Sequence, residues 1–278
     1  MSEAFQIMLW PLVACIVLPG LLIYLGLHII RRGIIFVDLA LAQVAALGTC
    51  VAVLLHHDAH DWQTFAWSGA FTFIGAAIFT LTRPRGHKVP QEALIGIVYV
   101  VAAAAGLLLL SRSPEGNEEL RKTLVGDVLL IRPLEIAITL GVFALIGLVH
   151  FIFRRQFMAI SHEPENAAAT ELRVWWWDFL FYALFGVVVT IIVHLFGVLL
   201  TFSFLIIPAV CSNLLVRTLA AQLAIGWVIA LLASGAGMVA SYQLDLPTGA
   251  AIVVALGLAL LLVGTSIGLW HRCRPALR

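Results

Sequence analysis

The chain has 278 residues, of which 62% are hydrophobic and 11% charged, and its mean hydropathy is +1.06. A soluble globular protein needs more polar surface than this composition supplies. Several apolar runs reach the ~20 residues with which a helix crosses a bilayer, and they lack the alternation of a transmembrane β-strand. The net charge of +1 gives no indication of a nucleic-acid partner. The composition predicts an all-α polytopic membrane protein in contact with the lipid bilayer.

The hydropathy pattern divides the chain into about nine spans within a single transmembrane domain, residues 1–278. These spans are 7–30, 34–55, 64–81, 92–111, 133–153, 174–194, 196–216, 221–243 and 248–270. Only His194 and Gly197 mark a turn between the sixth and seventh spans, so eight spans are the alternative. No linker is long enough to separate two domains.

The basic residues predict how the spans are oriented. Alternate crossings place five basic segments on one side: Arg31–Arg32, Arg83–Lys88, Arg154–Arg173, Arg217 and the C-terminal HRCRPALR. That side holds twelve of the sixteen Lys and Arg residues. By the positive-inside rule it is cytoplasmic, so the N-terminus is predicted outside and the C-terminus in the cytoplasm.

The second span contains two polar residues within the stretch FVDLALAQVAALG. Asp38 lies near its cytoplasmic start and Gln43 lies deeper. At ~100° per residue they are ~140° apart, so they do not share a face. An ionisable residue in a span is a functional hypothesis by default, and we treat Asp38 and Gln43 as candidate residues of a transport pathway. The structural alternative is that Asp38 pairs with a nearby arginine.

The outside loop HHDAHD is rich in potential metal ligands. His56, His57, Asp58 and His60 carry imidazole and carboxylate groups, which suit divalent transition metals. The loop lacks the ligand spacing of a closed structural zinc site, so a solvated loop is the alternative.

The longest cytoplasmic segment, residues 154–173, contains SHEPENAAATELR, which is typical of a short helix. Ser161 or His162 precedes it, Pro164 suits its first turn, and Glu163 and Glu165 favour its positive end. Such a helix either docks a partner or connects two spans along the membrane surface.

The chain lacks the sequence signatures of common enzymes. It contains no GxxxxGK[ST] phosphate-binding loop and no GxSxG or HExxH arrangement. We therefore predict a protein that is not an enzyme, binds no cofactor and has no ATPase site of its own.

Four stretches, in order, resemble the permeases of zinc- and manganese-type ABC importers. RRGIIFVDLALAQVAALG resembles the segment after the first helix, and QEALIGIVYVVAAAAGLLLLS followed by LVGDVLLI resembles the central region. SHEPENAAATEL resembles the coupling loop, and FSFLIIPAV with SYQLDLPTG resembles the C-terminal signature.

This resemblance implies a permease subunit in a bacterial cytoplasmic membrane that works as a pair of copies. Two separate ATPase subunits would use ATP, and an extracytoplasmic solute-binding protein would deliver a zinc-, manganese- or iron-class ion or a metal complex. Residues Glu163, Pro164, Glu165, Asn166 and Ala167 would contact the ATPase. The alternative function is a stand-alone secondary carrier or channel, which usually carries charges at the bilayer midplane, whereas here the charges gather near span ends.

The chain departs from the family pattern in its second span. Many members carry an Asp followed four residues later by a His; aligned on Gly48, those places hold Leu39 and Gln43. Asp38 is displaced by one position, which turns it by ~100°. A carboxamide oxygen suits Zn²⁺ less well than imidazole, so the family's metal site is not carried over to this chain.

Overall fold

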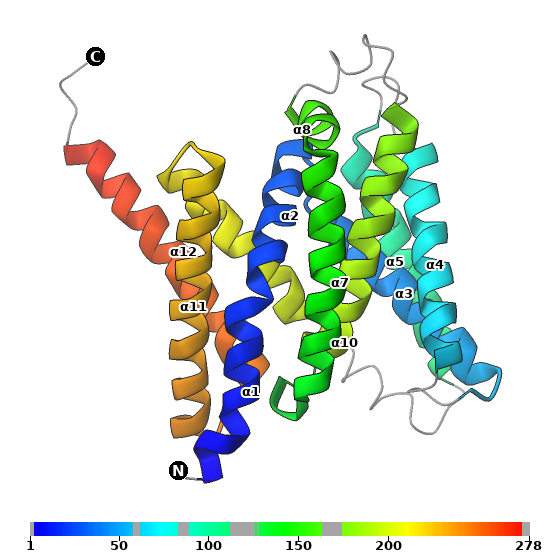
Figure 1. Ribbon diagram of the computed structural model, residues 1–278, viewed down its shortest axis with the longest axis horizontal. Coiled ribbons are helices and arrows are strands. Elements are labelled where there is room, and N and C mark those ends of the chain that lie inside the picture. The colour runs from blue at the N-terminus through cyan, green and yellow to red at the C-terminus, as the bar shows by residue number, and fades with distance from the viewer. Residues whose placement is uncertain are drawn as a thin grey trace. The chain divides into compact units, whose positions relative to one another are not determined.

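The computed structural model describes residues 3–57, 62–82, 89–111, 126, 128–162 and 174–273, and every regular element in these ranges is a helix (Figure 1). The helices are α1 Glu3–Val17, α2 Pro19–Arg32, α3 Val37–Leu54, α4 Trp62–Leu81, α5 Gln91–Leu110, η1 Val128–Leu130, α7 Pro133–Ile152, α8 Arg154–His162, α10 Val174–Leu215, α11 Leu219–Leu244 and α12 Thr248–Cys273.

Within the described ranges, eight helical stretches are long and apolar enough to cross a bilayer, with residues 8–32 counted as one stretch. The predicted all-α polytopic architecture is therefore confirmed. The predicted spans agree closely with the helices because apolar runs and polar punctuation are local features of the sequence.

The longest helix, α10, contains a break at the position that the sequence left open. Its 42 residues would extend ~60 Å as a straight helix, about twice the thickness of a hydrocarbon core. Gly197 has φ 74° and ψ 168°, which is not helical, so residues 174–196 and 198–215 are separate helical segments. Gly126, with φ 69°, lies so close to the backbone of Phe196 and Gly197 that a Cβ there would overlap it.

The predicted first span consists of two helices, because Pro19 interrupts it. A proline has no backbone N–H and cannot continue the hydrogen-bond pattern of the preceding turn. Near this break the Trp227 indole of α11 donates a hydrogen bond to the Ile16 carbonyl of α1 at 2.6 Å. The two helices α1 and α11 are thereby joined.

The chain forms two compact units, each made from separate stretches. Unit 1 comprises residues 1–27, 127–137 and 199–278, and unit 2 comprises residues 28–126 and 138–198. The helices α2, α7 and α10 each pass from one unit into the other, so no linker separates them.

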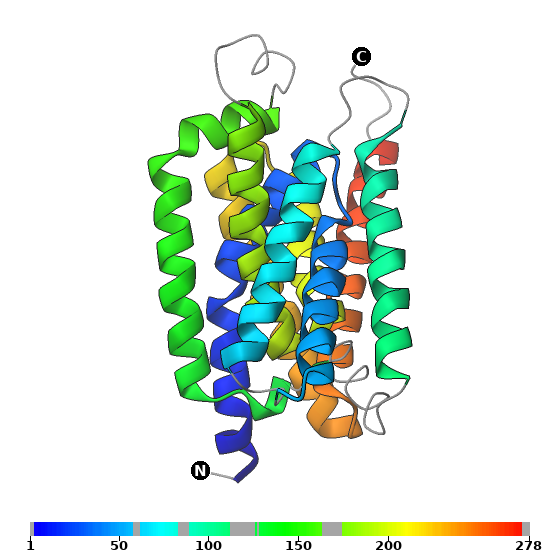
Figure 2. The ribbon, with the colours of Figure 1, turned by 90° about the vertical axis from the view of Figure 1, so that its right-hand side faces the viewer.

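In unit 1, α11 packs against α1 and α12. In unit 2, α3 packs between α4 and α5 (Figure 2). The buried face of α4 carries a hydroxyl or a small side chain every four residues, in the series Thr64, Ser68, Thr72, Ala76 and Thr80. Small residues allow membrane helices to approach closely, and Thr72 in the middle of this series is hydrogen bonded to Thr190 of α10 at 2.9 Å.

Candidate functional site

Asp38 lies in the first turn of α3 and is buried, with a relative exposure of 2%. A carboxylate is favoured near a helix N-terminus because the backbone N–H groups there point toward it. Its Oδ1 atom has no hydrogen-bond partner among the described residues. Arg32, a neighbouring arginine, pairs with Asp178, so the predicted alternative of a pair between Asp38 and a nearby arginine is wrong for Arg32.

Gln43 lies on a different side of α3 and is half-buried. Leu41 and Val44, which flank it in sequence, approach Gly75 of α4. The predicted angular separation is reflected in their burial: Asp38 belongs to the closed side of α3, and Gln43 to a more accessible side. The structure does not bring Asp38 and Gln43 together, and no described contact tests their predicted role in a pathway.

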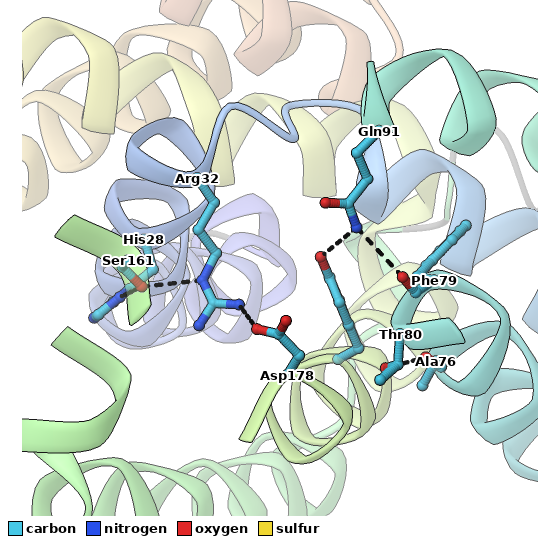
Figure 3. Close-up of polar contacts among 9 residues, drawn as sticks. His28, Arg32, Ala76, Phe79, Thr80, Gln91, Ser161 and Asp178 are labelled. Atoms are coloured by element: carbon cyan, nitrogen blue, oxygen red, sulfur yellow. Dashed lines mark hydrogen bonds and ion pairs between the residues drawn. The ribbon is translucent and has the colours of Figure 1, made fainter. Parts of the chain in front are cut away.

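A cluster of polar side chains that the sequence analysis did not predict joins the ends of three helices in unit 2 (Figure 3). Arg32 at the end of α2 donates from Nη1 to Asp178 Oδ1 of α10 at 2.9 Å. It also donates from Nε to Ser161 Oγ of α8 at 3.0 Å. His28, one turn before Arg32, is hydrogen bonded to the same Ser161 hydroxyl at 2.9 Å. We call His28, Arg32, Ser161, Asp178 and Phe181 the Arg32 cluster.

Aromatic rings surround the Arg32 cluster. The Arg32 guanidinium lies 3.9 Å from the centre of the Phe181 ring, within range for a cation–π interaction. The His150 ring stacks on Phe157 at 4.4 Å, and both rings lie near Phe181. The Arg32 and Asp178 side chains are only 6% and 2% exposed. The cluster is thus a desolvated ion pair in an aromatic setting.

Further contacts gather other helix ends at the same end of unit 2. The Gln91 amide at the start of α5 donates to Tyr182 Oη of α10 at 2.9 Å and to the Phe79 carbonyl of α4 at 3.3 Å (Figure 3). Glu92 accepts a hydrogen bond from the Phe36 backbone just before α3. The ends of α2, α4 and α8 and the starts of α5 and α10 therefore lie at this end of unit 2. That this end is cytoplasmic stays a prediction.

The tryptophans that open α10 have different environments. Trp175 and Trp176 are 53% and 50% exposed, the exposure that indoles at a membrane interface have. Trp177 turns inward and packs on Phe153 and Phe157 at 5.1 and 5.9 Å. Trp177 therefore belongs to the packing around the Arg32 cluster.

The predicted histidine-rich loop is only partly within the described residues. His56 has φ 65°, and the His56 and His57 backbone N–H groups donate to Val53 and Ala52, which closes the end of α3 in a Schellman motif. Asp58 and His60 lie outside the described residues. Among those that are described, no three His, Cys, Asp or Glu side chains come together as metal ligands would.

The predicted ATPase-contact residues Glu163, Pro164, Glu165, Asn166 and Ala167 also lie outside the described residues. The first part of their segment is helical, because α8 continues to His162. Ser161 is therefore in the last turn of a helix and belongs to the Arg32 cluster.

Apolar helices of spanning length, with buried charges near their ends, define a multi-pass α-helical membrane protein. The chain belongs to the ABC 3 transport family, which matches residues 4–266. It is thus a permease of the metal-type ABC transporters, located in the cytoplasmic membrane. This assignment confirms the resemblance seen in the sequence.

Individual relatives agree with the family. The manganese import system permease protein ScaB of Streptococcus gordonii is 26% identical, over 85% of this chain and 82% of its own length. The manganese transport system membrane protein MntC of Halalkalibacterium halodurans is 25% identical, over 83% of this chain and 77% of its own.

A solved structure shows the same fold. PsaBC from Streptococcus pneumoniae, in complex with Fab, has a chain with a TM-score of 0.77 and 23% identity, with coverage of 94% of this chain and 93% of that chain.

The Arg32 cluster was missed because its charges lie far apart in sequence. One signal was available: Arg32 closes one predicted span, and Asp178 opens another at the same predicted membrane boundary. Opposite charges at span ends on one side are candidates for pairing, because a lone charge near the bilayer is costly.

Proposed function

We propose that the chain is the permease subunit of an ABC importer for a divalent transition-metal ion of the zinc, manganese or iron class, or for a metal complex. The observation that carries this proposal is the family match over residues 4–266. Relatives that bear the name of manganese transport or import support the cargo class.

The proposed transporter contains two copies of this chain and two separate ATPase subunits. An extracytoplasmic solute-binding protein delivers the cargo. ATP is consumed by the ATPase, since this chain has no phosphate-binding loop in its sequence. The solved PsaBC complex, of similar fold, supports an assembly of more than one kind of chain.

The chain is proposed to have its N-terminus outside and its C-terminus in the cytoplasm. In this orientation the end of unit 2 that holds the Arg32 cluster faces the ATPase. Residues Glu163, Pro164, Glu165, Asn166 and Ala167, which follow α8 directly, make the contact.

The basic test is uptake by cells that express the chain with the ATPase and the binding protein encoded beside it. We expect accumulation of radioactive Mn²⁺ or Zn²⁺ that stops when the ATPase loses its catalytic glutamate. Uptake by the chain alone, without an ATPase, would instead identify a stand-alone carrier.

The ATPase contact is tested by charge reversal. Glu163→Lys with Glu165→Lys should lower co-purification of the ATPase about tenfold, because acidic groups at a protein contact are replaced by basic ones. The matched control is Glu118→Lys with Glu119→Lys, in the loop predicted on the opposite side. An equal yield of complex from both pairs would refute the assignment.

The pathway residues are tested by substitutions of similar size. Gln43→Leu and Asp38→Asn should each lower Mn²⁺ uptake by about tenfold or more while the ATPase still co-purifies, because each removes an oxygen ligand or a charge. The control is Thr49→Val, because the Thr49 hydroxyl donates a hydrogen bond to the Ala45 carbonyl of its own helix. Normal uptake by Gln43→Leu would make Gln43 a packing residue.

A further inference from the structure

One buried arginine contacts the chain on both sides of residues 163–173. α8 ends at His162, just before this segment, and α10 begins at Val174, just after it. Ser161, in the last turn of α8, and Asp178, near the start of α10, both bind Arg32. Ser161 and Asp178, which lie before and after this segment in sequence, are therefore joined through one side chain of α2.

The chemistry of arginine makes this joint rigid. The guanidinium is planar, so the directions of its Nε–H and Nη–H bonds are fixed relative to each other. With Ser161 at 3.0 Å and Asp178 at 2.9 Å, the positions of α8 and α10 are both tied to a single plane. A lysine ammonium is a compact point charge on a flexible stem and cannot impose that relation.

Two further contacts support the joint, one to the Ser161 hydroxyl and one to the guanidinium. His28 lies one turn before Arg32 on α2 and is hydrogen bonded to the same Ser161 hydroxyl, so α2 contacts α8 through two residues. Phe181 lies under the guanidinium at 3.9 Å and is one turn beyond Asp178 on α10, so α10 also contacts Arg32 through two residues.

Stability alone is a poor reason for such a pair. A buried ion pair is often no more stabilising than well-packed apolar side chains of the same volume, since both charges must leave water. Apolar packing does not fix how two helix ends are oriented relative to each other. The geometry of the Arg32 cluster does fix that orientation.

We propose that Arg32 is a positioning residue of the transport cycle, which joins the end of α8 to the start of α10 so that a displacement of residues 163–173 moves both helices together. This inference rests on the proposed function, because it takes that segment as the contact with the ATPase. Arg32 acts through Ser161 and Asp178.

The joint itself is tested on the full chain in lipid nanodiscs, without an ATPase. Arg32→Lys should speed amide hydrogen exchange about tenfold in both α8 and the start of α10, because local opening becomes easier when the shared partner is lost. The matched control is Gln91→Leu, which removes a contact of α4, α5 and α10 but none of α8. Unchanged exchange in α8 of Arg32→Lys would overturn the proposal whatever the ATPase does.

The role in transport is tested in proteoliposomes on the complex with the co-expressed ATPase, supplied with the solute-binding protein and Mn²⁺. For Arg32→Lys, Mn²⁺ moved per ATP hydrolysed should fall about fivefold or more, the size of a typical coupling between sites. The ATPase should co-purify in normal yield, because residues 163–167 are intact. Gln91→Leu should keep its ratio within about twofold.

A second variant separates positioning from stability. Arg32→Leu with Asp178→Leu removes both charges of the ion pair and should fold, yet it should show the same loss of Mn²⁺ per ATP. A normal ratio in this double variant would overturn the proposal. If the unchanged chain binds no ATPase, the proposed function fails and the role of Arg32 in coupling falls with it, whereas the exchange experiment still reports the joint.

Discussion

The Arg32 cluster of unit 2 and the contact between α11 and α12 in unit 1 join helices by opposite means. The Arg32 cluster uses an ion pair with exposures of 6% and 2% between groups far apart in sequence. The α11–α12 contact uses close backbone approach: a Cβ on Gly237 would lie 2.6 Å from Ile252 Cα. The polar contact there is between two hydroxyls, since Ser241 is hydrogen bonded to Thr248 at 2.8 Å.

This difference indicates two kinds of joint in one permease. Small residues in a membrane protein stabilise by close van der Waals contact, which specifies separation between helices more than the orientation of particular side chains. The Arg32 guanidinium, whose N–H groups point in fixed directions, also specifies the orientation of the side chains that it binds. The helix ends beside residues 163–173 have the directional joint, and the α11–α12 contact has the close-packed one.

The largest expected effect comes from removal of one charge from the Arg32 cluster. Asp178→Ala leaves the Arg32 guanidinium buried without its carboxylate, which should lower the free energy of unfolding by ~3–5 kcal/mol. Denaturation in mixed micelles, followed by circular dichroism, measures this change. The double variant Arg32→Leu with Asp178→Leu should recover most of the loss; equal losses in both variants would show that packing volume, and not charge, dominates.

A smaller effect is expected from added volume in the α11–α12 contact. Gly237→Ala places a methyl group against the Ile252 backbone, and overpacking of this kind costs ~1–3 kcal/mol. The matched control is Gly235→Ala on the same helix, where a Cβ meets nothing within 4 Å. The melting temperature in detergent should fall for Gly237→Ala and not for Gly235→Ala. A similar fall in both variants would contradict close packing at Gly237.

The smallest effect is expected from the hydroxyl pair of the same contact. Ser241 donates to the Leu246 carbonyl at 2.7 Å and is paired with Thr248. Ser241→Ala should cost ~1 kcal/mol, the net value of a typical hydrogen bond. Ser266→Ala serves as control, because its exposed hydroxyl donates to the Val263 carbonyl of its own helix. A loss at position 241 as large as that of Asp178→Ala would remove the distinction between the two joints.

The sequence predicted the helices well, because apolar runs and the polar residues that separate them are local features of the sequence. It placed the uncertain turn at His194 and Gly197, and the break is at Gly197, whose combination of φ 74° and ψ 168° is strained for any residue with a side chain. It also predicted that Asp38 and Gln43 lie on different sides of α3, since that follows from helical geometry alone.

Other features depended on contacts between distant segments. His56 was predicted as a metal ligand from its residue type, and the structure adds that its backbone conformation closes α3. Ser161 was expected before a helix that lies outside the described residues; it is in the last turn of α8 and binds Arg32. Neither outcome follows from residue type, because each depends on where the chain turns and on what lies beside it.

The sequence by itself determined that this protein spans a membrane, where most of its helices begin and end, and to which family it belongs. These properties depend on composition and on the order of short motifs along the chain. Only the tertiary structure decided which charges pair. Arg32 has Asp38 six residues away and Asp178 146 residues away, and it binds the distant one. Helix packing brings Asp178 to the guanidinium, while α3 turns the carboxylate of Asp38 into its own buried side.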